Sequence, residues 1–269
     1  MARKSAAKAQ AALDRAQDLL HSAWELRTAK RRIAVAERAI AISPICADAY
    51  VLLAEHAEPG SDAALDLWER GLEAGKQALG NSFADYEGAF WGFLETRPYM
   101  RARFGLGHAL WERGARDEAI GHLQGMLELN PNDNQGVRYI LAAWLLDAGR
   151  DDDLRGLLAE YPEDEMAAWS WTAALAAFRR DGDGAQSRRL LGAALKENGY
   201  IPAYLYGERR LPKTLPAFIC PGEEDEAMHY AADFGSGWHM TPGALDWLRA
   251  RSQAVKPARH PAPPKAKAA

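Results

Sequence analysis

The stretch that decides the fold is residues 100–133, which reads MRARFGLGHALWERGARDEAIGHLQGMLELNPND. Its small and apolar residues form two stripes at helical spacing: Leu106, Gly107 and Leu110, then Ala119, Leu123 and Met126. Recurrence at three- and four-residue steps is typical of helices, and a break at 114–116 separates the stripes. The stretch therefore predicts two antiparallel helices, and we expect them to cross closely at Gly107 and Ala119.

Related patterns precede and follow this unit, and no segment alternates polar and apolar residues over the length of a strand. The unit resembles a tetratricopeptide repeat, which has about 34 residues folded as helix, turn, helix. This resemblance implies an all-α fold in which roughly four to five helix pairs stack into an α-solenoid superhelix. The composition predicts these regions: an N-terminal helix at 1–27, a degenerate array of helix pairs at 28–197, a helical and loop C-terminal cap at 198–252, and a disordered basic Pro/Ala/Lys tail at 253–269.

Local signals add further predictions. Ser61 stands before an apolar run and is expected to cap a helix. Residues 81–96 hold five aromatic rings and are expected to form one short core helix that ends before Pro98. Gly235-Ser236-Gly237 lacks the flanking pattern of a nucleophile elbow and is expected to be a turn.

Composition limits the classes of protein to which this chain can belong. A formal net charge of −4 and a pI near 6.0 disfavour a protein that coats nucleic acid or anionic lipid. The first twenty residues carry charges where an export signal needs an apolar run, and no stretch of about 18 apolar residues could span a bilayer. Two widely separated cysteines, Cys46 and Cys220, cannot build a disulfide framework. These features predict a cytoplasmic protein.

The C-terminal two thirds of the chain carries short blocks that resemble a second family. These blocks are Leu52-Leu53-Ala54-Glu55, Gly71-Leu72-Glu73-Ala74-Gly75, Asn198, Ile201-Pro202, Tyr204-Leu205, Leu215-Pro216, Gly222, Glu226-Ala227, Tyr230-Ala231, Trp238 and Gly243-Ala244-Leu245. Together they look like the suppressor of tumorigenicity seven family over residues 49–249. The resemblance implies a helical repeat protein and brings no active site with it. Animal members of that family are membrane proteins, whereas this sequence lacks spanning segments.

A candidate recognition surface follows from helical geometry, because the first helix of each pair lines the concave face in repeats of this kind. We predict that this groove is lined by Arg97, Arg101, Phe104, His108, Trp111, Gln135 and Arg138. Guanidinium groups beside aromatic rings suit an extended peptide with acidic groups, since arginine pairs bidentately with carboxylate. The alternative is an internal role, in which the two rings pack on the aromatic segment before Pro98 and the first two arginines pair with Glu87 or Glu95.

Two other classes of function stay open. An RNA-associated factor would use the basic N-terminal region, with Arg27, Lys30, Arg31 and Arg32 on phosphates and Trp24 for stacking, although the acidic chain disfavours nucleic acid. An enzyme needs convergent catalytic groups, and the sequence shows no catalytic or cofactor-binding motif. Cys220, His229 and His239 match no zinc-binding interval. We therefore predict a non-catalytic adaptor, without metal or cofactor, whose partner is a protein or peptide.

Overall fold

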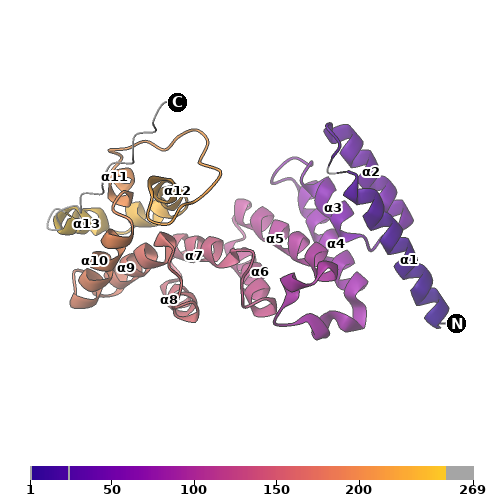
Figure 1. Ribbon diagram of the computed structural model, residues 1–269, viewed down its shortest axis with the longest axis horizontal. Coiled ribbons are helices and arrows are strands. Elements are labelled where there is room, and N and C mark those ends of the chain that lie inside the picture. Colours follow the sequence, from indigo (N-terminus) through magenta and orange to yellow (C-terminus); the bar gives the residue numbers. More distant parts are fainter. Residues whose placement is uncertain (1, 24, 253–269) are drawn as a thin grey trace, which may run out of the picture. The chain divides into compact units, whose positions relative to one another are not determined.

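The fold is entirely helical in the residues that the structure describes. In this computed structural model these are residues 2–23 and 25–252, with side chains from residue 7 onward. They form thirteen α-helices and three short 3-10 helices, and no strand occurs among them (Figure 1). The predicted all-α helical-repeat fold is confirmed. The tail at 253–269, predicted to be disordered, lies outside the described residues.

The chain divides into two compact units, residues 1–141 and 142–269, and the boundary falls inside a helix. The first unit contains α1 (Ala2–His21), α2 (Ala29–Ile42), α3 (Ala47–Ala54), α4 (Asp62–Leu79), η1 (Gly80–Tyr86), η2 (Phe90–Gly92), η3 (Leu94–Thr96), α5 (Arg97–Glu112), α6 (Arg116–Leu129) and the start of α7 (Val137–Asp147). The helices pack as successive pairs, α1 with α2, α3 with α4 and α5 with α6. Because α5 also packs on both α3 and α4, consecutive pairs stack as a helical repeat requires.

Small residues let the helices of the first unit approach closely. A Cβ added to Gly107 would lie 2.8 Å from Cδ1 of Leu123, and Ala119 is fully buried. A Cβ added to Gly75 of α4 would lie 2.9 Å from Cα of Tyr99 on α5. The predicted close crossing of α5 with α6 is confirmed, and the crossing of α4 with α5 depends on glycine in the same way.

Two side chains fix the points at which helices begin. Ser61 caps α4 as predicted, because its hydroxyl accepts the amide hydrogen of Ala64 at 3.1 Å. Asp133 adopts a left-handed backbone with φ 45°, and its carboxylate accepts the amides of Val137 and Arg138 at 2.8 and 3.0 Å. These bonds satisfy amide groups that have no partner within the first turn of a helix.

The prediction of a single helix at 81–96 is wrong, because this segment forms the three 3-10 helices η1 to η3. Gly88 takes a φ of +90° between η1 and η2, a backbone conformation that interrupts any α-helix and favours glycine. The rings nevertheless cluster. Phe83, Phe90 and Tyr99 have centroids 4.8 to 5.7 Å apart, and Phe90 is fully buried. The segment thus contributes to the core without being a regular helix.

The second unit has an aromatic core. It contains the rest of α7 with α8 (Asp151–Glu160), α9 (Ala167–Asp181), α10 (Ala185–Glu197), α11 (Ile201–Leu205), α12 (Glu224–Met240) and α13 (Ala244–Ser252). Trp171 of α9 lies 6.1 Å from Tyr230 and 5.8 Å from Trp238 of α12, measured between ring centroids. The indole N–H of Trp238 donates to the hydroxyl of Tyr230 at 2.8 Å, so this pair of buried polar groups is satisfied.

Gly235-Ser236-Gly237, predicted to be a turn, lies inside α12, so that prediction is wrong. A Cβ added to Gly237 would lie only 2.2 Å from Cδ2 of Leu146, and Ser236 donates to the carboxylate of Asp147 at 2.6 Å. The glycine therefore permits close packing of α12 on the C-terminal end of α7. The packing of α12 on α7 outweighs the low helix propensity of glycine, which costs about 1 kcal/mol per residue.

Candidate functional site

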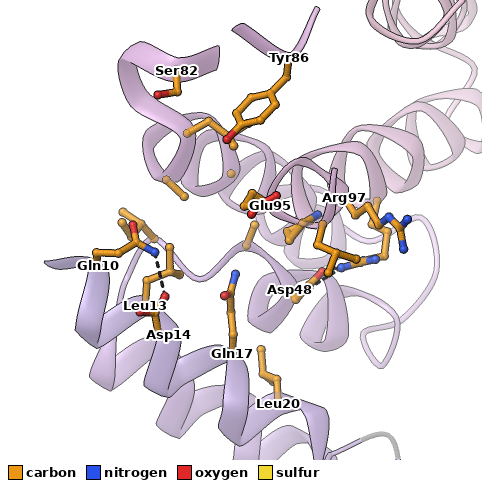
Figure 2. Close-up of a pocket in the computed structure, with 18 of the residues that line it drawn as sticks. Gln10, Leu13, Asp14, Gln17, Leu20, Asp48, Ser82, Tyr86, Glu95 and Arg97 are labelled. Atoms are coloured by element: carbon orange, nitrogen blue, oxygen red, sulfur yellow. Dashed lines mark hydrogen bonds and ion pairs between the residues drawn. The ribbon is translucent and has the colours of Figure 1, made fainter. Parts of the chain in front are cut away.

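A pocket of about 790 Å³ opens on the first unit (Figure 2). Its walls come from α1, the N-terminal ends of α3 and α5, the C-terminal end of α4, and the segment of 3-10 helices. Leucine side chains line it together with amide, hydroxyl, carboxylate and guanidinium groups. This mixture and this size suit a site that binds an apolar group and orients it through a few polar contacts.

One wall is a face of α1, which is amphipathic. Leu13 and Leu20 are buried in a core shared with α2 and α3, and this packing fixes the rotation of α1 about its axis. Figure 2 shows Gln10, Asp14 and Gln17 projecting from α1 on the side where the pocket lies. The amide of Gln10 donates to Asp14 at 2.9 Å. α1 thus presents a row of amide and carboxylate groups to the pocket.

The floor holds an ion pair between α3 and α5. Nε of Arg101 donates to Oδ1 of Asp48 at 2.8 Å, and Nη2 donates to Oδ2 at 2.6 Å. The carboxylate is mostly buried, with 17% of the Asp48 side chain exposed against 37% of the Arg101 side chain. Such bidentate, charge-assisted pairs are among the strongest polar contacts in proteins. The pair therefore occupies the edge of this guanidinium that Nε and Nη2 form.

The facing wall is the segment 80–96, which the end of α6 anchors. The backbone N–H of Gly88 donates to the carbonyl of Leu129 at 2.9 Å, and that of Trp91 donates to Oδ1 of Asn130 at 3.2 Å. Leu94 lines the pocket from this wall and is 71% exposed. The anchoring bonds hold an exposed apolar side chain at the edge of the pocket.

Only the first two of the predicted groove residues line this pocket. Arg97 and Arg101 both do, but each is engaged within the chain. Nε of Arg97 donates to the carbonyl of Trp91 at 3.1 Å, and its guanidinium lies 5.3 Å from the centroid of that ring. Arg101 pairs with Asp48 rather than with the carboxylates of segment 80–96 proposed in the alternative reading.

The predicted residues in the middle and C-terminal part of α5 lie outside the pocket lining. Phe104, His108 and Trp111 are half-buried, and the rings of Phe104 and His108 have centroids 4.6 Å apart. The guanidinium of Arg116 lies 5.0 Å from the Trp111 ring centroid. Burial lowers the pKa of His108, with a smaller opposing effect from the charge of Glu112, and therefore favours the neutral imidazole.

Gln135 and Arg138, the last two predicted residues, lie near the start of α7 and do not line the pocket. Nη1 of Arg138 lies 2.9 Å from Oδ2 of Asp133, whose side chain is only 1% exposed. Nη2 donates to the hydroxyl of Tyr139 at 2.7 Å. Arg138 therefore supports the beginning of α7.

The residues that sequence reasoning missed are the polar groups of the other walls: Gln10, Asp14, Gln17, Ser82, Tyr86 and Glu95. A signal for α1 existed, because its polar residues at positions 10, 14 and 17 form a stripe beside buried leucines. Nothing in the periodicity showed that this stripe meets segment 80–96. That juxtaposition depends on packing between segments more than 60 residues apart along the chain.

The basic residues of the RNA alternative lie away from the pocket. Arg27 is in the connection between α1 and α2, and Lys30 and Arg31 are exposed in the first turn of α2. Nε of Arg32 donates to the carbonyl of Leu26 at 2.9 Å. Trp24, the proposed stacking residue, lies outside the described residues.

Neither thiol is activated. Burial raises the pKa of Cys46 to about 11, and the hydrogen bond to Asp225 raises the pKa of the exposed Cys220. Both shifts disfavour the thiolate, which is the nucleophilic form of cysteine. Within the described part of the chain, no three His, Cys, Asp or Glu side chains come together as metal ligands would.

Comparison with known proteins gives relatives that are named ST7 homolog or suppressor of tumorigenicity 7. The chain is 26% identical to the ST7 homolog of Caenorhabditis elegans over 86% of this chain and 49% of the relative. It is 26% identical to the suppressor of tumorigenicity 7 protein-like of Bos taurus and 25% identical to that of Homo sapiens, covering 86% of this chain and 46% and 44% of the relatives. The chain is similar to the suppressor of tumorigenicity 7 proteins. It spans about half the length of the curated relatives it matches.

The similarity to the suppressor of tumorigenicity 7 proteins agrees with the sequence blocks quoted above, and these names specify no ligand or partner. No family model matches the chain, and no solved structure gives a significant match. Among the described helices, none combines the length and the apolar character needed to cross a membrane.

Proposed function

We propose that this chain is a non-catalytic, cytoplasmic adaptor of the tetratricopeptide-like class that holds a segment of another protein in the pocket of its first unit. The observation that carries the proposal is the pocket of about 790 Å³ at the ends of stacked helix pairs. Helical repeats use such concave surfaces to bind polypeptides. The free cysteines, Cys46 and Cys220, support a reducing compartment.

The chemistry of the walls supports a polypeptide ligand. Gln10 and Gln17 on α1 and Tyr86 on the facing wall offer both donors and acceptors, which are the groups that pair with peptide N–H and C=O. Leu94 supplies exposed apolar surface beside them. A peptide segment satisfies both requirements, because it carries a polar backbone with apolar side chains attached.

A pocket-filling substitution tests this function. Gln17→Trp places a large ring in the pocket, whereas Asp18→Trp places the same ring at the next position of α1, which is exposed and does not line the pocket. The wild type and both variants are used as bait for affinity capture, after circular dichroism shows equal helicity. We expect proteins that the wild type and Asp18→Trp capture but Gln17→Trp loses. Capture of the same proteins in equal amounts by all three baits would contradict the proposal.

Charge reversal of the two most prominent arginines is a poorer test. Arg101 bonds Asp48 and Arg138 bonds Asp133, so Arg101→Glu and Arg138→Glu would each place two carboxylates together inside the first unit. Removing one partner of a largely buried ion pair is strongly destabilising. Lost capture with these variants would therefore report lost folding rather than a lost contact.

A further inference from the structure

The charges that line the pocket are unequally available to a ligand. Its charged side chains other than histidine are those of Asp14, Asp48, Glu95, Arg97 and Arg101. Asp48 and Arg101 satisfy each other through two short hydrogen bonds. A ligand carboxylate would have to displace Asp48 from this pair before it could bind the same guanidinium in the same way.

Arg97 is also engaged, by the carbonyl and ring of Trp91. By contrast, Asp14 on α1, which accepts one hydrogen bond from the neutral Gln10 amide, and Glu95 on η3 are both exposed and lie on facing walls. Figure 2 shows Glu95 on the far side of the pocket from α1. A cation between the two walls would therefore meet a carboxylate on each side.

The sequence of the facing wall strengthens this bias. Segment 80–96 carries Asp85, Glu87 and Glu95 and contains no lysine or arginine. Two exposed apolar side chains lie directly before Glu95: Phe93 is 44% exposed and Leu94 is 71% exposed. Exposed apolar surface beside one sign of charge favours a ligand in which an apolar residue neighbours the opposite charge.

We propose that the segment held in the pocket is basic: a stretch of a partner protein in which lysine or arginine neighbours a large apolar residue. The cation lies between Asp14 and Glu95, and the apolar side chain covers Leu94. This inference rests on the proposed function, and it replaces the acidic ligand predicted from the arginines, because Arg101 gives its Nε and Nη2 to Asp48 and Arg97 gives its Nε to the carbonyl of Trp91.

Selection from a random peptide display library tests this directly. The wild-type full chain is the target, and bound peptides are eluted by competition and sequenced. Peptides are then measured by fluorescence anisotropy against Asp14→Lys/Glu95→Lys, with Asp18→Lys/Glu69→Lys as the control. The control makes the same change of charge at exposed positions of α1 and α4 outside the pocket lining.

We expect the selected peptides to pair lysine or arginine with an apolar residue. Their affinity should fall about tenfold for Asp14→Lys/Glu95→Lys, change less than threefold for the control, and weaken as salt rises. Peptides that depend on the pocket, as shown by loss of binding to Gln17→Trp, but are acidic or uncharged would overturn the inference and leave the proposed function standing. Failure to select any peptide that Gln17→Trp loses would overturn both.

A second basic stretch to test is part of the chain's own sequence, because residues 253–269 include Lys256, Arg259, Lys265 and Lys267 and no acidic residue. Replacing these four residues by alanine in the full chain should leave the affinity for the selected peptides unchanged. An affinity that rises about tenfold would show that the chain's own segment fills the pocket, and would overturn the assignment to a separate partner.

Discussion

Glu226 is a buried carboxylate on which three segments of the second unit converge. It is 4% exposed, and its Oε1 accepts the amide of Ala167 at 2.8 Å. Its Oε2 accepts the side-chain amide of Asn198 at 2.9 Å and the backbone amide of Gly222 at 2.8 Å. A single side chain thereby joins the starts of α9 and α12, the end of α10 and the loop before α12.

Removing this carboxylate should be costly, because three N–H groups would lose their acceptor, two of them in buried hydrogen bonds. We expect Glu226→Ala to lower the free energy of unfolding by about 2 to 4 kcal/mol, measured by urea denaturation. Glu223→Ala is the control, because that side chain is exposed and makes no capping bond. Equal and small effects of the two substitutions would contradict this role for Glu226.

Glycine at the helix crossings gives a second prediction at this scale. Gly75→Ala would bring a methyl group within 2.9 Å of the Tyr99 backbone, whereas a Cβ at Gly121, in α6, meets nothing within 4 Å. We expect Gly75→Ala to destabilise the protein by about 1 to 3 kcal/mol and Gly121→Ala to stabilise it by up to about 1 kcal/mol. Thermal unfolding of both variants measures the difference. Stabilisation by both would show that α4 and α5 do not cross closely.

At the scale of elements, periodicity predicted the helix pairs because each helix buries one face. The pair α5 and α6 and the turn between them lie where the apolar stripes placed them. The two wrong predictions fall where a factor other than the spacing of apolar residues determines the backbone conformation. Gly88 has a positive φ, which prevents one continuous helix in the aromatic segment. Gly237 lies within a helix because Leu146 packs into the space that a side chain at this position would occupy. Neither effect has a signature in spacing alone.

The docking of α13 supplies a pH-dependent test. Asp183, in the turn between α9 and α10, accepts hydrogen bonds from Arg188 at 2.8 Å, Trp247 at 2.9 Å and Nε of Arg251 at 3.2 Å. Bonds from Arg188 and then Arg251 hold the pKa of Asp183 well below its usual range. Two of the donors, Trp247 and Arg251, belong to α13, so the carboxylate ties this helix to the turn.

Because the folded pKa is depressed, the stabilisation by Asp183 is fully present above the unfolded value of about 3.9 and is lost as pH falls through the folded value. We expect Asp183→Asn to have a lower urea midpoint than the wild type at pH 6. The difference should shrink as the pH is lowered from 5 to 3. A difference that stays constant over this range would show that ionised Asp183 does not hold α13.

At the scale of the whole molecule, the helical-repeat class was predictable because it depends on local pattern, whereas the candidate site was predictable only in part. Arg97 and Arg101 line the pocket because they occupy the first turns of α5. Their internal partners, Trp91 and Asp48, and the opposite wall at Asp14 come from other segments. These contacts join segments that lie far apart along the chain. The spacing of residues in a single sequence does not show which distant segments pack together.

The pocket of the first unit is proposed to receive a segment of another protein. Photocrosslinking tests it most directly: benzoylphenylalanine replaces Gln17, which faces the pocket, or Asp18, which does not, and each full chain is irradiated in native extract. We predict discrete adducts from position 17, mapped by mass spectrometry to basic, apolar-containing stretches of a partner, and none of these from position 18. Identical adducts from both positions, or none from position 17, would contradict the account.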